Sequence, residues 1–241
     1  MKRILIFLTY VLSHYSMANG IEIRDSSYQQ AFIEIEQMLD GRRELSFKRA
    51  VFLTENAYLD NVLTYDEFNK PINQLVYLAQ QIVTNDDVKY NYSDRSAVAK
   101  NAAIFRLLKD TTSFVMVRVS GSSYTLRTVP TTYDLQDFWG KEDWTKMFVT
   151  KLLVTNSGNC HSLPILYKIL AEELGTKAYL AMAPNHTYIK QWSEKTGWYN
   201  TELTTGTFPK DADIKWSSYI KTEAVAKGVY MDTLSQRQSI A

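Results

Sequence analysis

The chain changes its hydrophobic periodicity near residue 112, and this change limits its fold more than any other feature does. From about residue 26 to residue 110, apolar residues recur three and four positions apart, as on the buried faces of helices. Beyond that point, short runs rich in β-branched and aromatic residues are separated by turn residues and by further helical patterns. We therefore expect a helical N-terminal region over 19–112, followed by a region over 113–241 that mixes strands and helices.

The helical region carries its own boundary signals. Gly41 ends the first segment and Ser46 opens the second. Residues 64–67 have the spacing of a capping box, and Pro71 suits the first turn of the helix that follows. A fourth helix is expected over 94–109. We interpret the apolar stripes of these segments as packing surfaces.

The second region has a less regular pattern. Its predicted helices span 134–154, the stretch from Cys160 to a stop at Gly175, and 222–227. Its predicted strands are 113–119, 124–129, 176–183, 186–191 and 198–203.

The N-terminus has the three parts of a secretory signal. Lys2 and Arg3 give a basic start, residues 4–12 are mostly apolar, and Ser16 and Ala18 place small residues at a cleavage site. The apolar run is too short to span a bilayer. We expect a signal peptide over 1–18, cleavage near Ala18, and a periplasmic or secreted protein without a membrane anchor. The alternative is an ordinary N-terminal strand or helix.

Composition excludes some classes of partner. Hydrophobic residues make up 45% and charged residues 22% of 241, which is ordinary for a globular protein. The net charge is +1 and no basic cluster is present, so we expect no nucleic-acid partner. The single cysteine forms no internal disulfide. An exported domain of this kind is therefore either stable without disulfides or keeps its thiol for chemistry.

Cys160 stands where a helix is expected to begin. The positive end of a helix dipole favours thiolate over thiol, so a thiol there is a candidate nucleophile. His186 and Glu202 lie on two later predicted strands and supply a candidate base and an orienting acid. Asn200 shares a strand face with Glu202, and either residue can accept a hydrogen bond from the imidazole. We favour Glu202, because a carboxylate stabilises an imidazolium better than an amide does.

Other roles for these residues were weighed. A lone cysteine is often a small buried apolar residue. His161 points about 100° away from its neighbour Cys160, and we expect it to line the cleft or to pair with a backbone carbonyl. Cys160, His161 and His186 have poor spacing for zinc, and no calcium-binding loop is present. We expect no metal and no cofactor.

The segments around these residues resemble the transglutaminase-like cysteine enzyme superfamily. The resemblance covers about residues 135–208: Gly158 and Cys160 with the apolar helix after them, Asn185 to Tyr188, and Trp198 to Thr204. The longer pattern, with 138–140 and 230–232, is similar to a group of exported bacterial proteins. The resemblance implies an α+β, papain-like core, with one central helix on an antiparallel sheet. It also implies the order Cys160, His186, Glu202, although aspartate is usual at the third position.

The oxyanion of the reaction would need two donors. The Cys160 backbone N–H is one, and the family pattern points to a tryptophan or glutamine ahead of the cysteine for the other. Trp144 is the candidate, with Trp139 and Asn156 as alternatives. Asn159 and Asn200 are further candidates for the cleft.

Three functions remain open at this stage. The first is thiol-dependent acyl transfer from a peptide, protein or amide, ending in hydrolysis or cross-linking. The second is a non-catalytic module of the same fold that binds a peptide or glycan. The third is a scaffold that assembles through its helices. The sequence specifies neither the substrate, nor the oligomeric state, nor whether Cys160 is active or covered.

Overall fold

The computed structural model of the chain describes residues 26–85 and 88–241, and the predicted signal segment lies outside them. The described part is mixed α and β, with helices dominating its first third. Two compact units form, one ending at Phe68 and including Gln236–Ala241, the other spanning Asn69–Ser235. None of the described helices is long and apolar enough to cross a membrane.

The helices before residue 112 follow their sequence signals closely. Residues 26–39 are helical, and Gly41 beyond them has a positive φ of 83°. The Ser46 side chain accepts a hydrogen bond from the Arg49 N–H and caps the next helix. The helix that Ser46 caps is α2 (Phe47–Tyr58), and it is followed by α3 (Tyr65–Asn85) and α4 (Arg95–Lys109).

The start of α3 confirms the predicted capping box but corrects the place of Pro71. Thr64 N–H donates to the Glu67 carboxylate (2.8 Å), while Glu67 N–H donates to the Thr64 hydroxyl (3.3 Å). The helix therefore begins at Tyr65, and Pro71 lies inside it rather than in its first turn. The capping box, rather than the proline, therefore determines where this helix begins.

The strands form three small sheets. A hairpin pairs β1 (Ser113–Val117) with β2 (Ser123–Arg127), and a short parallel pair joins β3 (Thr132–Tyr133) to β4 (Ser157–Gly158). The third sheet is antiparallel in the order β5-β6-β7, with the bounds Tyr179–Ala183, His186–Ser193 and Gly197–Thr201.

The predicted helix over 134–154 is wrong for its first half, residues 134–143. Only η1 (Trp144–Met147) and α5 (Val149–Thr155) are helical. The buried carboxylate of Asp137 accepts hydrogen bonds from three backbone N–H groups, those of Lys141, Glu142 and Asp143. These N–H groups are withdrawn from helix formation, so the segment forms a loop.

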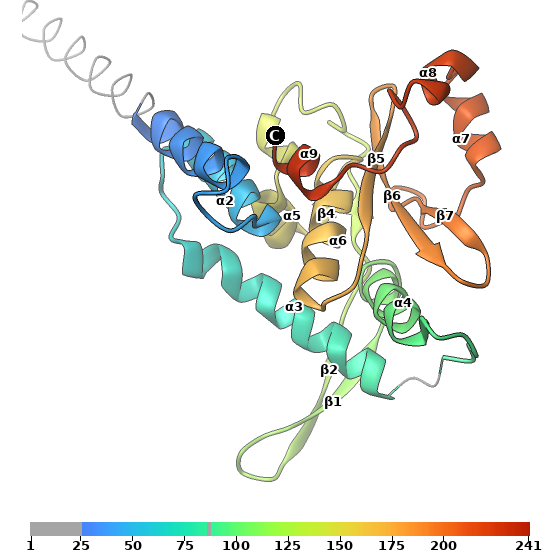
Figure 1. Ribbon diagram of the computed structural model, residues 1–241. Coiled ribbons are helices and arrows are strands. Elements are labelled where there is room, and N and C mark those ends of the chain that lie inside the picture. Colours follow the sequence, from blue (N-terminus) through green and yellow to red (C-terminus); the bar gives the residue numbers. More distant parts are fainter. Residues whose placement is uncertain (1–25, 86–87) are drawn as a thin grey trace, which may run out of the picture. The chain divides into compact units, whose positions relative to one another are not determined.

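Helix α6 (Ser162–Glu173) packs against β5 and β6 (Figure 1). A buried chain of hydrogen bonds crosses this contact: Thr201 Oγ1 donates to Gln191 Oε1 (2.7 Å), and Gln191 Nε2 donates to the Tyr167 hydroxyl (3.0 Å). The Tyr167 hydroxyl in turn donates to the Asn101 carbonyl of α4 (2.7 Å). These bonds link β7 and β6 to α6 and α4, and so fix how the sheet packs on the two helices.

The other face of the sheet is covered by the C-terminal helices. Ala181 and Tyr188 pack there with Ile214, Ile220 and Met231. These come from or beside α7 (Asp211–Ser217), which the sequence pattern missed, and α8 (Thr222–Ala226), which it predicted. The last helix, α9 (Gln236–Ile240), belongs to the first unit.

A substitution at Gly158 tests the packing between β4 and α6. A Cβ atom at this position would lie 2.6 Å from Ser162 Oγ and 3.1 Å from Leu152 Cδ1. We expect Gly158→Ala to lower the free energy of unfolding by about 1–3 kcal/mol, measured by chemical denaturation. In a Ser162→Ala background, which removes the nearest atom, the same substitution should cost less. An equal cost in both backgrounds would contradict this explanation.

Candidate active site

The start of α6 is held by the buried side chain of Asn159. Its Oδ1 accepts hydrogen bonds from the N–H groups of His161 (3.0 Å) and Ser162 (3.1 Å). Its Nδ2 donates to the Phe138 carbonyl (3.1 Å). Asn159 therefore caps α6 and ties it to the 134–147 loop, so Cys160 is fixed between a buried cap and the first helical turn.

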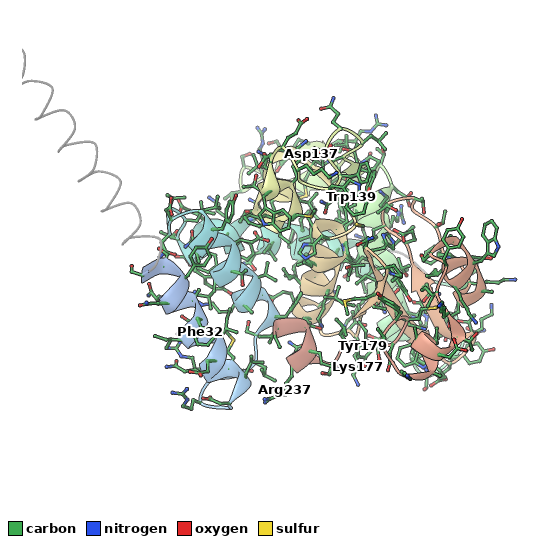
Figure 2. The ribbon with its side chains drawn as sticks, turned by 90° about the horizontal axis from the view of Figure 1, so that it is seen from above. Phe32, Asp137, Trp139, Lys177, Tyr179 and Arg237 are labelled. Atoms are coloured by element: carbon green, nitrogen blue, oxygen red, sulfur yellow. The ribbon has the colours of Figure 1, made fainter. Side chains whose placement is uncertain are left out.

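The 134–147 loop and the β3–β4 pair support the segment that leads into Cys160. Asp134 N–H donates to the Gly158 carbonyl (2.8 Å), which continues the parallel pairing of β3 and β4. Lys146 forms an ion pair with Asp134 (2.8 Å). Figure 2 shows Asp137 and Trp139 of this loop well apart from Lys177 and Tyr179 at the opposite end of the sheet.

The turn between β5 and β6 brings His186 to Cys160. Asn185 has a positive φ of 56°, which asparagine tolerates better than most residues. Its carbonyl faces the thiol, with 3.9 Å between the Asn185 oxygen and Cys160 Sγ. His186 is the first residue of β6, and its imidazole lies close enough to Cys160 for that side chain to help raise its pKa.

The second contact of His186 is with Glu202. The distance from His186 Nε2 to Glu202 Oε2 is 2.5 Å. Because Nε2 is engaged there, the other ring nitrogen, Nδ1, is the one left for Cys160. The remaining oxygen, Glu202 Oε1, accepts hydrogen bonds from the N–H (2.9 Å) and hydroxyl (2.8 Å) of Thr204. Cys160, His186 and Glu202 thus lie in series from separate segments, with the hydrogen-bonded His186–Glu202 end anchored by Thr204.

This arrangement sets the charges of the site. Burial by itself disfavours the imidazolium, but the hydrogen bonds and charges of Cys160 and Glu202 outweigh burial and raise the pKa of His186 to about 10. Burial raises the pKa of Glu202, but the hydrogen bond and charge of His186, together with the bonds from Thr204, overcome it and lower that pKa. Both groups are therefore held in their charged forms at neutral pH.

Asn200 does not share the position of Glu202. Its Nδ2 donates to the Pro209 carbonyl (3.0 Å) and to Asp211 Oδ1 (2.7 Å), so it fastens β7 to the start of α7. Asp211 also accepts a hydrogen bond from the buried Lys190, which lies opposite Asn200 on β6. Asn200 is buried away from the imidazole, and its place in the structure is that of a packing residue.

Among the described residues, the other candidates for the cleft form no side-chain hydrogen bond with Cys160, His186 or Glu202 and make contacts of their own. His161 is exposed, and its Nδ1 donates to the Met147 carbonyl (3.0 Å). Asn156 Nδ2 donates to the Pro130 carbonyl (2.9 Å). Trp144 in η1 and Trp139 in the loop before it are about half exposed. In the described part of the chain, neither tryptophan donates a hydrogen bond into the series of three.

Two residues near the site had no role in the sequence interpretation. Burial, together with the charges of Cys160 and Glu202, raises the pKa of Tyr133, so its hydroxyl stays neutral in the neighbourhood of both groups. Burial lowers the pKa of Lys109, and the Glu202 charge partly opposes this effect. Lys109 Nζ also donates to the Thr131 carbonyl (3.1 Å). No local signal marks Tyr133, because the two-residue strand β3 arises only from its pairing with β4.

The site provides a nucleophile, a charged proton donor and a backbone donor. Within residues 26–85 and 88–241, the Cys160 N–H has no hydrogen-bond acceptor, so it is free to bind an oxygen. Among the same residues, no three histidine, cysteine, aspartate or glutamate side chains gather as a metal site. The arrangement suits attack by sulfur on a carbonyl carbon, with charge developing on the carbonyl oxygen.

Comparison with known proteins gives no further assignment. No protein-family model matches the chain, and neither a curated protein nor a solved structure is significantly similar to it.

The shifted pKa values of His186 and Glu202 make the free energy of unfolding depend on pH. The raised pKa of His186 contributes stability that is complete below its ordinary value of 6.5 and is lost as pH rises through about 10. The lowered pKa of Glu202 contributes stability that is present above 4.5 and is lost in acid. Glu202→Gln should therefore cost about 2 kcal/mol near pH 6 and progressively less toward pH 10, measured by denaturation across pH.

A control carboxylate lies at the β6–β7 turn. Glu194 accepts a hydrogen bond from the Ser93 N–H and has no histidine partner among the described residues. Glu194→Gln should shift stability equally at pH 6 and pH 10. A Glu202→Gln cost that stays constant over this range would contradict the charge assignment.

Proposed function

We propose that the chain is a thiol-dependent acyl-transfer enzyme of the transglutaminase-like type, acting on the carbonyl of an amide or peptide. In this proposal α6 and the β5-β6-β7 sheet form a papain-like core. The observation that carries it is the series Cys160–His186–Glu202. The series comes from one helix start and two strand segments, and it has an imidazole whose pKa is raised to about 10.

The first half of the reaction uses the charged pair. Cys160 Sγ attacks the carbonyl carbon as thiolate while His186 is an imidazolium, and the Cys160 N–H donates to the developing oxyanion. His186 Nδ1 then gives its proton to the leaving nitrogen as the carbon–nitrogen bond breaks. An acyl-enzyme and a free amine result. Glu202 holds the ring in place and stabilises its positive charge.

The second half restores the enzyme. The neutral imidazole takes a proton from water as the water oxygen attacks the thioester, and the sulfur leaves as thiolate. An amine in place of water would give cross-linking by the same steps. We favour hydrolysis, because water needs no second binding site.

The proposal also covers where the protein acts. An export signal over 1–18 would deliver the chain to the periplasm or the exterior, where a structural disulfide is usual but a lone thiol is not. A thiol retained in that setting fits chemistry better than it fits packing.

The reactivity of Cys160 tests the central step. A free thiol with an ordinary pKa of about 8.5 is less than about 1% thiolate at pH 6. Labelling by iodoacetamide should therefore be fast near pH 6 in the wild type and about 10- to 100-fold slower in His186→Ala, since the imidazolium stabilises the thiolate. Cys160 is half-buried and is the only cysteine, so mass spectrometry reports this rate directly.

Two neighbouring residues serve as matched controls. His161→Ala removes an imidazole beside the thiol that is bonded to the Met147 carbonyl, and it should leave the labelling rate unchanged. Asn200→Ala should leave the pH profile unchanged, whereas Glu202→Gln should shift it. Slow labelling that ignores His186 would indicate a structural thiol, and the non-catalytic binding module would then be the better explanation.

Turnover is the final requirement. A screen of amide and peptide substrates should find activity that Cys160→Ala abolishes while the fold, judged by circular dichroism, is retained. A Cys160→Ala variant with full turnover would exclude the proposed mechanism.

A further inference from the structure

The β1–β2 hairpin has one edge that borders a groove. Figure 1 shows the hairpin extending away from α6 and the β5-β6-β7 sheet. The cavity beside it measures about 630 Å³, and five consecutive residues of β1, Ser113–Val117, line it. No residue of β2 does. Because successive side chains of a strand point to opposite faces, a cavity that touches all five must lie along the strand's edge.

The hydrogen-bond pattern identifies which backbone groups face that edge. Thr128 N–H donates to the Thr112 carbonyl and Arg118 N–H donates to the Ser122 carbonyl, both at 2.8 Å. In an antiparallel ladder such bonded pairs alternate with unbonded ones. The N–H and C=O groups of the even-numbered residues of β1 therefore face β2. Those of Ser113, Val115 and Val117 face away from it.

Among the described residues, these outward groups have no backbone hydrogen-bond partner. The strand also lacks the features that usually protect an open edge. It carries no proline and no charged residue, and Val115 and Val117 are 75% and 72% exposed. Such an edge is a template for pairing with another strand.

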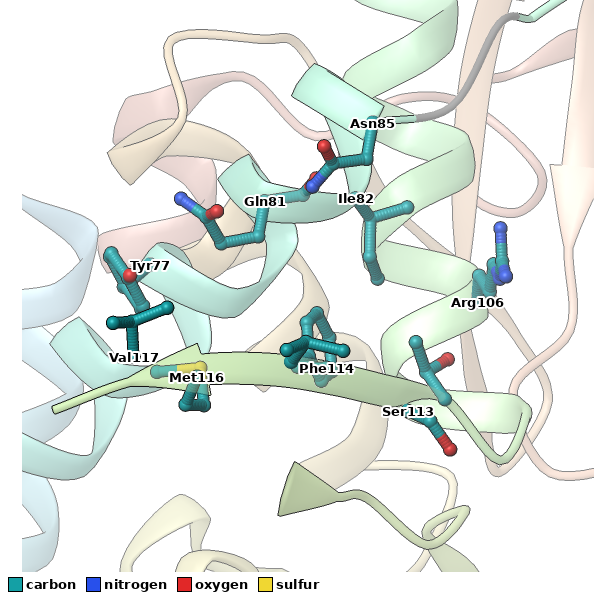
Figure 3. A pocket seen from close by; sticks show the side chains of 11 residues that line it. Tyr77, Gln81, Ile82, Asn85, Arg106, Ser113, Phe114, Met116 and Val117 are labelled. Atoms are coloured by element: carbon teal, nitrogen blue, oxygen red, sulfur yellow. The ribbon is translucent and has the colours of Figure 1, made fainter. Parts of the chain in front are cut away.

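The opposite wall of the groove is polar. Tyr77, Gln81 and Asn85 lie at intervals of four along α3 and so form one stripe, and Figure 3 shows Gln81 and Asn85 across the groove from β1. Arg106 of α4 lies at the Ser113 end and, among the described residues that line the groove, is the only lysine, arginine, aspartate or glutamate. The groove thus offers main-chain bonds on one side, amide groups on the other and a positive charge at one end.

We propose that this groove binds an extended segment of another polypeptide, which adds to the free edge of β1 as a third strand and places a carboxylate beside Arg106. About five residues would span the edge, roughly 17 Å of extended chain. The groove is walled by α3, so it admits a single strand more readily than a second hairpin. It shares no residue with Cys160, His186 or Glu202 and does not depend on the chemistry proposed for them.

Selection of binders from a peptide library, carried out on the whole chain, tests the proposal. Random peptides about seven residues long with free carboxyl ends are selected on the wild-type protein, and the tightest binder is resynthesised with a fluorophore for anisotropy. Methylation of alternate backbone nitrogens of this peptide should abolish binding in one register and not in the other. Binding should be unchanged in Cys160→Ala, because the thiol lies outside the groove.

A pair of proline substitutions separates the two edges of the hairpin. Val115→Pro removes an outward N–H from the groove edge and should weaken binding at least about tenfold. Thr125→Pro is its matched control. Thr125 lies directly opposite Val115, and its N–H faces away from the ladder on the far edge. This variant should bind within about twofold of the wild type, which also controls for damage to the hairpin.

A double-mutant cycle tests the pairing of Arg106 with the peptide carboxylate. Arg106→Gln and replacement of the peptide carboxylate by an amide should each weaken binding about three- to tenfold, with no further loss when both are present. The proposal is overturned if no binder is recovered, or if binding ignores both Val115→Pro and backbone methylation. Dimers of the chain that Val115→Pro abolishes would assign the edge to a second copy and would also overturn it.

Discussion

The buried amide of Asn159 is the interaction on which the geometry of the thiol depends. A helix leaves its first N–H groups without partners, and here one side chain satisfies two of them while its own N–H₂ group reaches the 134–147 loop. The position of Cys160 is therefore set by helix capping and by loop structure at once. An alanine in place of Asn159 would leave buried donors and acceptors unpaired, and it would release both segments together.

The sheet side of the site depends on a second buried polar series. The bonds through Thr201, Gln191 and Tyr167 hold the sheet against α6 in a single register. A slip of one residue in β6 would turn His186 to the opposite face of the sheet, away from Glu202. The two series act on different elements, but both determine whether sulfur and imidazole meet.

The same physical rule explains why the β1 edge stands out. Polar backbone groups in the described elements are satisfied by ladders, by caps or by side chains such as Asp137. Along β1 the chain instead presents alternate N–H and C=O groups to a groove with a polar opposite wall. The groove beside these groups, rather than the apolar character of the hairpin alone, is what points to a partner strand.

The sequence by itself determined the local elements whose signals lie within a few residues. The caps at Ser46 and Thr64, the stop at Gly175 and the strand at His186 follow from side-chain chemistry and period, which act at short range. It also limited the nucleophile to Cys160, since no other thiol exists.

Only the tertiary structure decided the rest. The sequence favoured Glu202 but left Asn200 open, and the place of Asn200 depended on where α7 packs, because Pro209 and Asp211 bind its amide. The loop at 134–143 replaced a predicted helix because Asp137 gathers three backbone donors into a buried carboxylate. The proximity of Tyr133 to the thiol arises from a two-residue parallel pairing. Each of these depends on contacts between segments distant in the chain, whose free energy no local pattern records.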